Sequence, residues 1–438
     1  MSKLFTVLAL GCSLFATAQD FDRQKMDSLF NILENNNKGM GSFAIHKQGE
    51  PVYANAIGYS DISKGAKANA LTKYRIGSIS KTFTAAMILQ LVEEGKLSLD
   101  TQLSKFYPGI PNAESISIED LLRHQSGLFN FTNEEAYLDY MEQPKSKEEL
   151  LTIFKAQEPV FEPGEKNDYS NTNYVLLSFI LEDLDGKSYA EILKNRITQP
   201  LNLKNTYYGR KIDSGNAEAY SYQKMKDWQP ATETDLSIPL GAGGIVSTPT
   251  DLNLFFTALF EGKVLKSETF KKMKTLKNGF GMGLFRYPFN EKTLYGHTGG
   301  IDGFNSISTF YPEEDLSVSY VSNGTDFSPN DILIGAMSIY WNLDYTLPSF
   351  EPSLEVSEEK LKEYIGTYGS ETFPLEVKIF IEDETLMGQA TGQPSFPLEA
   401  YEEDKFQYTI ARLKLEFNPE ANKLTLLQGG GTYELTRK

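Results

Sequence analysis

The sequence predicts an α+β fold in which an antiparallel sheet is flanked by helices and is followed by a small C-terminal β-barrel. The sheet is predicted by successive strand-like segments joined by short turns, because short connections favour antiparallel pairing. These segments are Gly279–Phe289, Leu294–His297, Phe304–Tyr311 and Leu316–Val321. The barrel is predicted by residues 354–438, where short alternating segments recur after one brief helical signal. Helical patterns in the first half of the chain supply elements that would cover the sheet.

The chain is long and acidic. Its 438 residues, of which 40% are hydrophobic, can bury a large core and form more than one domain. The 42 Lys and Arg residues against 59 Asp and Glu residues give a net charge of −17. Because nucleic-acid binding depends on a basic surface, this balance argues against a nucleic-acid partner.

Four parts are predicted along the chain. Residues 1–19 would be a signal peptide, 20–345 the main domain, 346–353 a linker and 354–438 the barrel. The linker is predicted from two prolines in a short polar run. The main domain should therefore contain the helices and the antiparallel sheet.

The first nineteen residues have the pattern of a secretory signal peptide. An apolar run from Leu4 to Ala16 ends in the small-residue stretch Ala16-Thr17-Ala18-Gln19, which is typical of a cleavage site. The chain is therefore predicted to be exported, to the periplasm or beyond, and no later segment has the run of about 18 apolar residues expected of a transmembrane span. Cys12, the single cysteine, could instead carry a lipid. We favour its removal with the signal peptide, because the apolar run before it is short.

One motif combines a hydroxyl group with an amine. Ser78 and Lys81 lie three residues apart at the start of a predicted helix, so their side chains would share one face. Serine attacks a carbonyl carbon when a base takes its proton, and a buried lysine can be that base. The N–H groups of a first helical turn would also stabilise an oxyanion. Alone, S-x-x-K is more often an N-capping serine followed by a solvent-exposed lysine, so the context has to decide.

Two further segments supply that context. Asp168-Tyr169-Ser170-Asn171 precedes an apolar run, and His297-Thr298-Gly299-Gly300 lies on a predicted strand. In this order, S-x-x-K, Y-x-N and H-T-G resemble the three signature elements of the serine β-lactamase and penicillin-binding-protein superfamily. The Y-x-N form is similar to the branch of class C β-lactamases, DD-carboxypeptidases and esterases. Residues 354–438 resemble the lipocalin-like domain attached to some of these hydrolases.

The resemblance implies a β-lactamase/transpeptidase-like fold with an all-helical subdomain, and an acyl-enzyme mechanism. Ser78 would attack the substrate carbonyl, while Lys81 and Tyr169 would share the proton transfers as base and acid. Which of these two side chains deprotonates Ser78 stays open, and the pair should titrate as one unit. The backbone N–H groups of Ser78 and Gly300 would form the oxyanion hole.

The same resemblance implies roles for the remaining motif residues. Asn171 would donate its amide to Lys81 or to a substrate carbonyl. Thr298 would line the opposite wall of the site, and Gly299 would let the substrate lie close to the strand, which would be the innermost one of the sheet. His297 departs from the K-T-G of many β-lactamases, and a partly charged histidine holds a substrate carboxylate less firmly than a lysine does. We therefore expect hydrolysis of D-peptides or esters in preference to β-lactams.

Three alternatives are weaker. A Ser-His-Asp hydrolase would have to use His46, His124 or His297, and no G-x-S-x-G elbow is present; His46 and His124 are expected to be structural. A metal hydrolase is disfavoured because these histidines do not form H-E-x-x-H, so no metal and no cofactor are predicted. A penicillin-binding sensor or an inactive wall-binding protein would be acylated but would hardly turn over its substrate. The expected partner is a small-molecule or peptidoglycan-like peptide substrate, and the sequence leaves the oligomeric state open.

Overall fold

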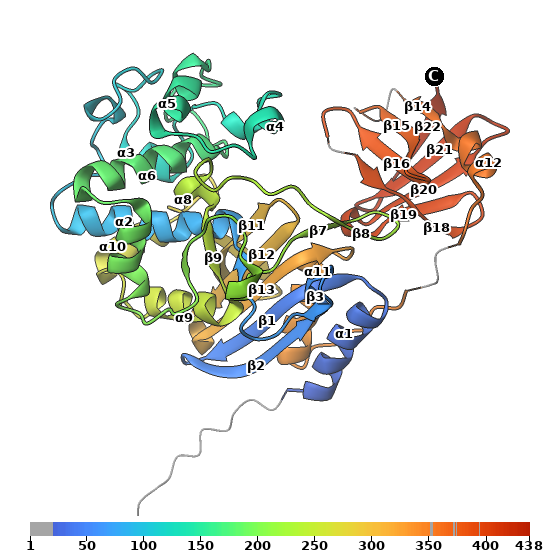
Figure 1. Cartoon of the computed structure of the whole chain (residues 1–438), viewed down its shortest axis with the longest axis horizontal. Helices are drawn as coiled ribbons and strands as arrows, with labels where there is room; N and C mark the ends of the chain where they lie inside the picture. Colours follow the sequence, from blue (N-terminus) through green and yellow to red (C-terminus); the bar gives the residue numbers. More distant parts are fainter. Residues whose placement is uncertain (1–20, 351–353, 371–372, 374, 394) are drawn as a thin grey trace, which may run out of the picture.

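The computed structural model describes residues 21–350, 354–370, 373, 375–393 and 395–438. The predicted signal peptide, including Cys12, lies outside these residues. Over the described part of the chain, a six-stranded antiparallel sheet with helices on both faces is followed by a nine-stranded, nearly closed barrel (Figure 1). This arrangement confirms the predicted fold class. No helix of the described ranges is long and apolar enough to cross a membrane.

The central sheet joins the first strands of the chain to strands more than two hundred residues later. Its order is β10-β11-β12-β13-β1-β2. The strands are β1 (Gly39–Lys47), β2 (Glu50–Ile57), β10 (Phe285–Phe289), β11 (Lys292–Ile301), β12 (Phe304–Tyr311) and β13 (Leu316–Thr325). Because β1 pairs with β13, strands from the two ends of the main domain are neighbours in one sheet.

Helices cover both faces of this sheet and build a separate helical region above it. The helices are α1 (Arg23–Asn35), α2 (Ser80–Glu93), α3 (Ile118–Leu122), α4 (Tyr137–Tyr140), α5 (Lys147–Ala156), α6 (Asn171–Asp185), α7 (Tyr189–Leu193), α8 (Leu240–Gly243), α9 (Pro249–Phe260), α10 (Ser267–Lys274), α11 (Pro329–Tyr340) and α12 (Glu358–Leu361). α1 and α11 share one apolar cluster with the sheet, and α2 and α9 share the cluster on its other face. The sheet is therefore a layer between two cores.

Short strands connect these layers. They are β3 (Tyr59–Asp61), β4 (Ala66–Lys67), β5 (Tyr74–Arg75), β6 (Tyr207–Tyr208), β7 (Tyr222–Lys224), β8 (Trp228–Pro230) and β9 (Ile245–Ser247). β9 pairs with both β5 and β6, so the chain segment that leads to Ser78 is fixed against segments from the middle of the sequence.

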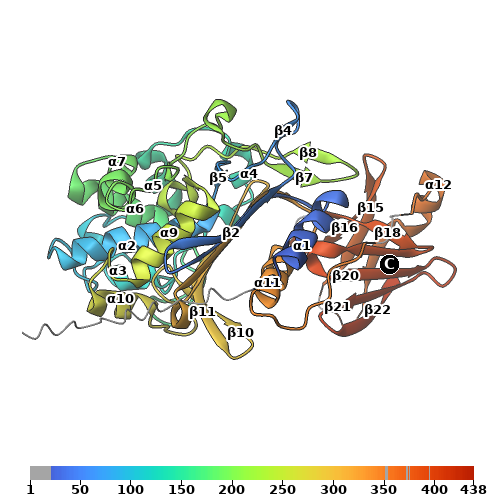
Figure 2. The ribbon, with the colours of Figure 1, turned by 90° about the horizontal axis from the view of Figure 1, so that it is seen from below.

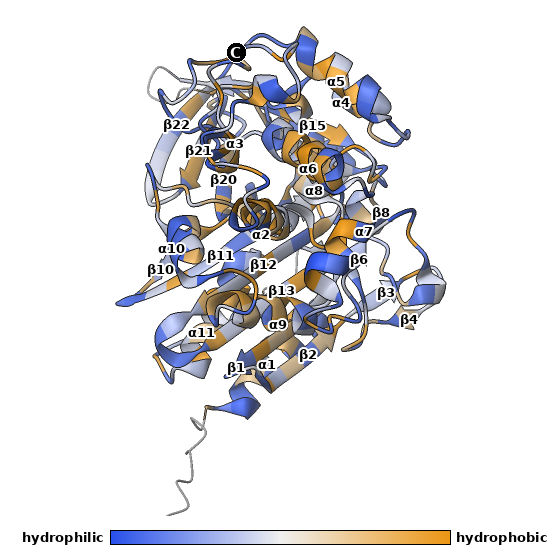
Figure 3. Ribbon diagram, turned by 90° about the vertical axis from the view of Figure 1, so that its left-hand side faces the viewer, coloured by the Kyte–Doolittle hydropathy of each residue, from blue (hydrophilic) through white to orange (hydrophobic). Residues whose placement is uncertain are grey.

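The helix that follows Ser78 is enclosed by the rest of the domain. Every residue of α2 from Ser80 to Leu89 is buried, which is typical of a helix that is apolar on all sides. Figure 3 views α2 nearly along its axis, with other elements around it. The predicted helix start at Ser78 is wrong by two residues: Ser78 lies in a 3₁₀ turn, Gly77–Ile79, and α2 begins at Ser80. Gly77, with a φ of 50°, opens this turn in a conformation that favours glycine.

Two strand predictions also need correction. The segment predicted from Gly279 forms a strand only from Phe285, because Gly279 and Gly283 have positive φ angles and turn the chain. β11 is second from the edge and is not the innermost strand of the sheet. Moreover, β10 pairs only with residues up to Gly296. In the described chain, β11 therefore has no strand partner on that side from His297 onward.

The C-terminal barrel has its own apolar core. Its strands are β14 (Gly366–Gly369), β15 (Val377–Glu382), β16 (Thr385–Ala390), β17 (Phe396–Pro397), β18 (Glu399–Glu402), β19 (Lys405–Tyr408), β20 (Leu413–Asn418), β21 (Lys423–Gln428) and β22 (Gly431–Arg437). The sheet begins with β17 and ends with β18, which follow each other in the sequence. A single residue, Leu398, connects β17 to β18, so the two edge strands of the sheet lie near each other.

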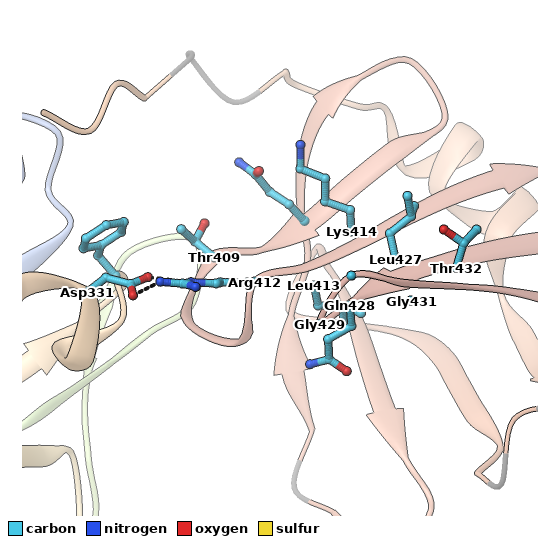
Figure 4. A pocket seen from close by; sticks show the side chains of 13 residues that line it. Asp331, Thr409, Arg412, Leu413, Lys414, Leu427, Gln428, Gly429, Gly431 and Thr432 are labelled. Carbon is cyan, nitrogen blue, oxygen red and sulfur yellow. Dashed lines mark hydrogen bonds and ion pairs between the residues drawn. The ribbon is translucent and has the colours of Figure 1, made fainter. Parts of the chain in front are cut away.

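The barrel docks beside α1 and α11, which lie between it and the central sheet (Figure 2). Lys38 Nζ bridges the two domains: it lies 2.6 Å from Asp326 Oδ2 and 2.9 Å from Glu399 Oε2. Arg412 of the barrel pairs with Asp331 of α11 at the rim of a cavity of about 480 Å³ (Figure 4). None of the predicted catalytic side chains lines this cavity, so we regard it as a crevice between the domains.

The beginning of the predicted linker packs on the main domain. Leu347 and Phe350 join the cluster that contains α1 and α11, and the Phe350 ring lies 5.5 Å from that of Phe327. Residues 351–353 lie outside the described residues.

Lys38→Met should destabilise the docked chain strongly. Removing the amine leaves the buried Asp326 carboxylate and the nearby Glu399 carboxylate without a counter-ion, which costs about 3 kcal/mol or more in comparable sites. Lys67→Met is the matched control, because Lys67 is 57% exposed in its pair with Glu34 and should change stability by about 0.5 kcal/mol or less. Urea unfolding of both variants checks this, and equal effects would contradict it.

Candidate active site

Ser78 and Lys81 meet as their spacing predicts. Lys81 Nζ lies 3.0 Å from Ser78 Oγ, 2.7 Å from Asn171 Oδ1 and 2.7 Å from the carbonyl oxygen of Ala242. Lys81 is fully buried, whereas Ser78 stays partly exposed. A neutral amine can donate to the two carbonyl-type oxygens and still accept the proton of the Ser78 hydroxyl.

The electrostatics of the site favour that neutral amine. Burial holds the pKa of Lys81 well below its usual range, because a buried ammonium loses its hydration. The phenol of Tyr169 lies beside the Ser78 hydroxyl. Burial raises the pKa of Tyr169 above its usual value. Of the two groups beside Ser78, Lys81 is therefore the one suited to accept a proton, and Tyr169 the one suited to donate it.

Tyr169 is held in place by stacking. Its ring lies 4.4 Å from that of His124, and Lys81 Nζ lies 4.8 Å from the Tyr169 centroid. His124 Nδ1 accepts a hydrogen bond from the backbone N–H of Ser170, at 3.1 Å. The structural role expected for His124 is consistent with this position. Its contribution to orienting Tyr169 could not be read from the sequence, because the two residues are 45 positions apart.

Asn171 faces Lys81 with its amide oxygen. The hydrogen bond therefore runs from Lys81 to Asn171, opposite to the direction predicted. The Asn171 NH₂ group donates to Thr132 Oγ1 at 3.1 Å, and its backbone N–H donates to Asn130 Oδ1 at 2.9 Å. Asn130 and Thr132 were not predicted from the sequence, since they carry no motif of their own. Together these contacts orient the Asn171 oxygen toward the buried amine.

The turn that carries Ser78 lies directly on β11. A Cβ atom added to Gly299 would lie 2.1 Å from the Ile76 carbonyl oxygen and 2.9 Å from Ser78 N. A Cβ atom added to Gly77 would lie 2.8 Å from Gly300 N. The backbone N–H groups of Ser78 and Gly300 are thus on neighbouring segments that only glycines allow to approach so closely.

A buried arginine secures the end of β11 beside this turn. Arg75 pairs with Asp302 and with Glu233, both at 3.0 Å, and donates to the carbonyl oxygen of Thr234 at 2.7 Å. Asp302 also accepts from the Thr234 hydroxyl at 2.6 Å. Because Asp302 follows β11 directly, this network fixes the strand end relative to the segment that leads into Ser78.

His297 is neutral in this setting. Burial lowers its pKa to about 3. Its Nδ1–H donates to the Thr298 carbonyl oxygen, and its Nε2 has no hydrogen-bond partner among the described residues. The ring lies 6.4 Å from that of Tyr169. His297 therefore cannot supply the fixed positive charge that a lysine at this position would carry.

Thr298 points to the opposite face of the strand from His297. It is exposed and hydrogen-bonds with Tyr287 of the neighbouring strand β10. Burial raises the pKa of Tyr287 to about 12, so its hydroxyl group stays neutral. Tyr287 was not predicted as a site residue, and only the strand register brings it to Thr298.

The end of α8 and the residue after it supply a contact that was not predicted from the sequence. The Ala242 carbonyl oxygen is the third partner of Lys81. A Cβ atom on Gly241 would lie 2.3 Å from Ser178 Oγ and 2.5 Å from Thr84 Oγ1. The glycine is therefore needed for this backbone to reach the buried lysine.

Gly299→Ala should lower kcat/KM on a chromogenic ester by about 10²-fold, because its methyl group would push Ile76 and Ser78 away from β11. Gly39→Ala, on β1 of the same sheet, is the matched control: its Cβ would make only ordinary contacts, with the Tyr320 hydroxyl at 3.6 Å and the Gly324 carbonyl oxygen at 3.7 Å. Steady-state rates and circular dichroism of both variants check this. Equal activity of the two variants would show that the close approach at Gly299 does not matter.

Comparisons with known proteins agree with this geometry. The β-lactamase family model matches residues 29–335. The chain is 25% identical over 446 residues to penicillin-binding protein 4* of Bacillus subtilis (strain 168), covering 94% of this chain and 98% of that protein. It is 29% identical over 299 residues to the teichoic acid D-alanine hydrolase of Staphylococcus aureus (strain MRSA252), covering 66% and 69% of the two chains.

A solved structure of a hydrolase has a similar fold. The D-amino acid amidase from Ochrobactrum anthropi SV3, in complex with D-phenylalanine, matches with a TM-score of 0.63 and 26% sequence identity. The match covers 73% of this chain and 99% of the amidase. Since the family model spans well over half of the chain and the fold agrees with it, this chain belongs to the β-lactamase family, within the superfamily of serine β-lactamases and penicillin-binding proteins, and is a hydrolase of that fold.

Proposed function

We propose that this chain is an exported serine hydrolase that forms an acyl-enzyme on Ser78. The observation that carries the proposal is the position of Ser78, which is partly exposed and whose Oγ lies 3.0 Å from the buried Lys81 amine and beside the Tyr169 phenol. A hydroxyl group placed between a neutral amine and a neutral phenol has a base and an acid at the same atom. No cofactor is required for this chemistry.

The proposed reaction begins with proton transfer from Ser78 to Lys81. Ser78 Oγ then bonds to the substrate carbonyl carbon, and the backbone N–H groups of Ser78 and Gly300 stabilise the oxyanion. As the intermediate collapses, the bond to the leaving group breaks and Tyr169 donates the proton that the leaving group needs. The proton on Lys81 restores the phenol, and water attacks the acyl-enzyme in a second cycle of the same steps.

The substrates proposed are D-amino-acid esters and amides, ahead of β-lactams. Support comes from two relatives whose names state such substrates, the teichoic acid D-alanine hydrolase and the D-amino acid amidase. The neutral His297 adds to this, because the site lacks at that position a cation for the carboxylate of a β-lactam.

A second candidate function is a penicillin-binding protein that is acylated and deacylates slowly. The similarity to penicillin-binding protein 4* over nearly the full chain favours it. The two candidates differ in the lifetime of the acyl-enzyme.

Intact-mass analysis should therefore show one covalent adduct after exposure to a fluorophosphonate, and none in Ser78→Ala. Ser78→Ala should also lower kcat/KM for a D-alanine ester by about 10⁴-fold or more. Ser267→Ala, at an exposed helical position, is the matched control and should behave as the parent chain. Labelling of the Ser78→Ala variant would refute the proposal. A penicillin adduct that persists for hours, without ester turnover, would favour the second candidate.

The pH dependence of kcat/KM tests which group is the base. Because the pKa of Lys81 is lowered, the fall in activity that accompanies protonation of Lys81 should lie well below the pH at which a free lysine titrates. His297→Gln should keep the same acid limb, since His297 with a pKa of about 3 does not titrate there. An acid limb near pH 10, where a free lysine titrates, or its loss in His297→Gln, would contradict the assignment.

A further inference from the structure

A cavity of about 510 Å³ lies on the face of the central sheet that α11 covers, and Thr298 of the H-T-G motif is part of its wall. Such a volume is in the range of small-molecule binding sites. The other walls come from β10, β11, β12, α11 and the segment after α11. The lining residues are Tyr287, Pro288, Phe289, Asn290, Leu294, Thr298, Ile307, Thr309, Asn330, Leu333, Ile334, Met337, Ser338, Leu343 and Asp344.

The lining of this cavity is suited to an apolar, uncharged group. Leu294, Ile307 and Met337 form a buried apolar floor, while Leu333 and Ile334 of α11 are only half-buried. All of these residues lie within the described chain, and none of the lining residues is basic. A carboxylate would therefore lose its hydration in the cavity without gaining a cation.

One polar group in the cavity wall lacks a partner. Thr309 is 0% exposed, and its Oγ1 has no hydrogen-bond partner among the described residues. A buried hydroxyl without a partner is uncommon, because its desolvation is not compensated. Thr309 lies on β12 opposite Gly296, close to the start of the motif. It could donate a hydrogen bond to an oxygen of a bound molecule.

Thr298 links the cavity to the strand that lies against Ser78. It is exposed, belongs to the cavity wall together with Tyr287, and lies in the stretch of β11 that β10 does not pair with. Ser78 lies across the same strand, against Gly299. A substrate lying along the unpaired edge from Thr298 to Gly300 would place its carbonyl at Ser78 and one of its ends at the mouth of the cavity.

We propose that this cavity binds an uncharged, apolar end of the substrate hydrolysed at Ser78, and that it selects aliphatic or aromatic groups over carboxylates. The inference rests on the proposed function of Ser78. It goes beyond that function because it assigns the substrate preference to side chains of α11 and β12, outside the three motifs. Asp344 at the cavity wall adds to the selection, since its exposed carboxylate repels an anionic substrate end.

Two series of esters test the inference, one lengthened in the acyl group and the other in the alcohol. In the series whose added methylenes enter the cavity, kcat/KM should rise about two- to fourfold for each methylene until the cavity is filled. An ester of the same length that ends in a carboxylate should lose that gain. Flat profiles in both series, or an equal gain for the carboxylate-ended ester, would overturn the proposal.

Cavity-filling variants connect the preference to these side chains. Ile334→Trp and, as a second variant, Leu333→Trp should bring the ratio of kcat/KM between long and short esters close to one. Ile365→Trp, at a 40% exposed position on the barrel side, should leave this ratio as in the parent chain. An unchanged ratio in both α11 variants would refute the assignment.

Labelling of Ser78 by a short-chain fluorophosphonate separates the two proposals. If Ser78 is labelled and the ester profiles are flat, only the cavity proposal fails. If Ser78 is not labelled, the proposed function fails, and the cavity proposal fails with it.

Discussion

The burial of the Lys81 amine is the constraint on which the rest of the site depends. A lysine that reaches its neutral form inside a protein needs exclusion of water and acceptors for its remaining N–H groups. α2 supplies the first by being enclosed on all sides, and Asn171 and the Ala242 carbonyl supply the second. These partners come from three separate segments of the chain. The lowered pKa of Lys81 is therefore a property of the assembled domain and not of the S-x-x-K motif alone.

A second constraint is the contact between the Ser78 turn and β11. Gly77 and Gly299 allow two backbone segments to approach within distances that any side chain would prevent. Arg75 holds the C-terminal end of β11, which lies beside this turn, through its ion pair with Asp302. Because β10 stops pairing at Gly296, the same strand keeps an open edge beside the nucleophile. The strand β11 thus combines rigid positioning with an edge that β10 leaves unpaired.

The neutral His297 and the apolar cavity under Thr298 have related consequences. His297 on one face of β11 carries no charge, and the cavity under Thr298 on the other face has no basic residue among its described lining residues. The docked barrel lies on the other side of α11, and ion pairs of Lys38 and Arg412 join it to the main domain.

The sequence by itself determined the fold class, the family and the proximity of Ser78 to Lys81, because a helical turn fixes the distance between residues three apart. The antiparallel sheet and the barrel also followed from local alternation and short turns. Only the tertiary structure decided which way the Asn171 amide faces, that Ala242 and Thr132 take part, and that Tyr287 reaches Thr298. It also decided that β11 keeps a free edge. These features depend on strand register, glycine contacts and burial between distant segments, and such long-range packing leaves no pattern in a local stretch of sequence.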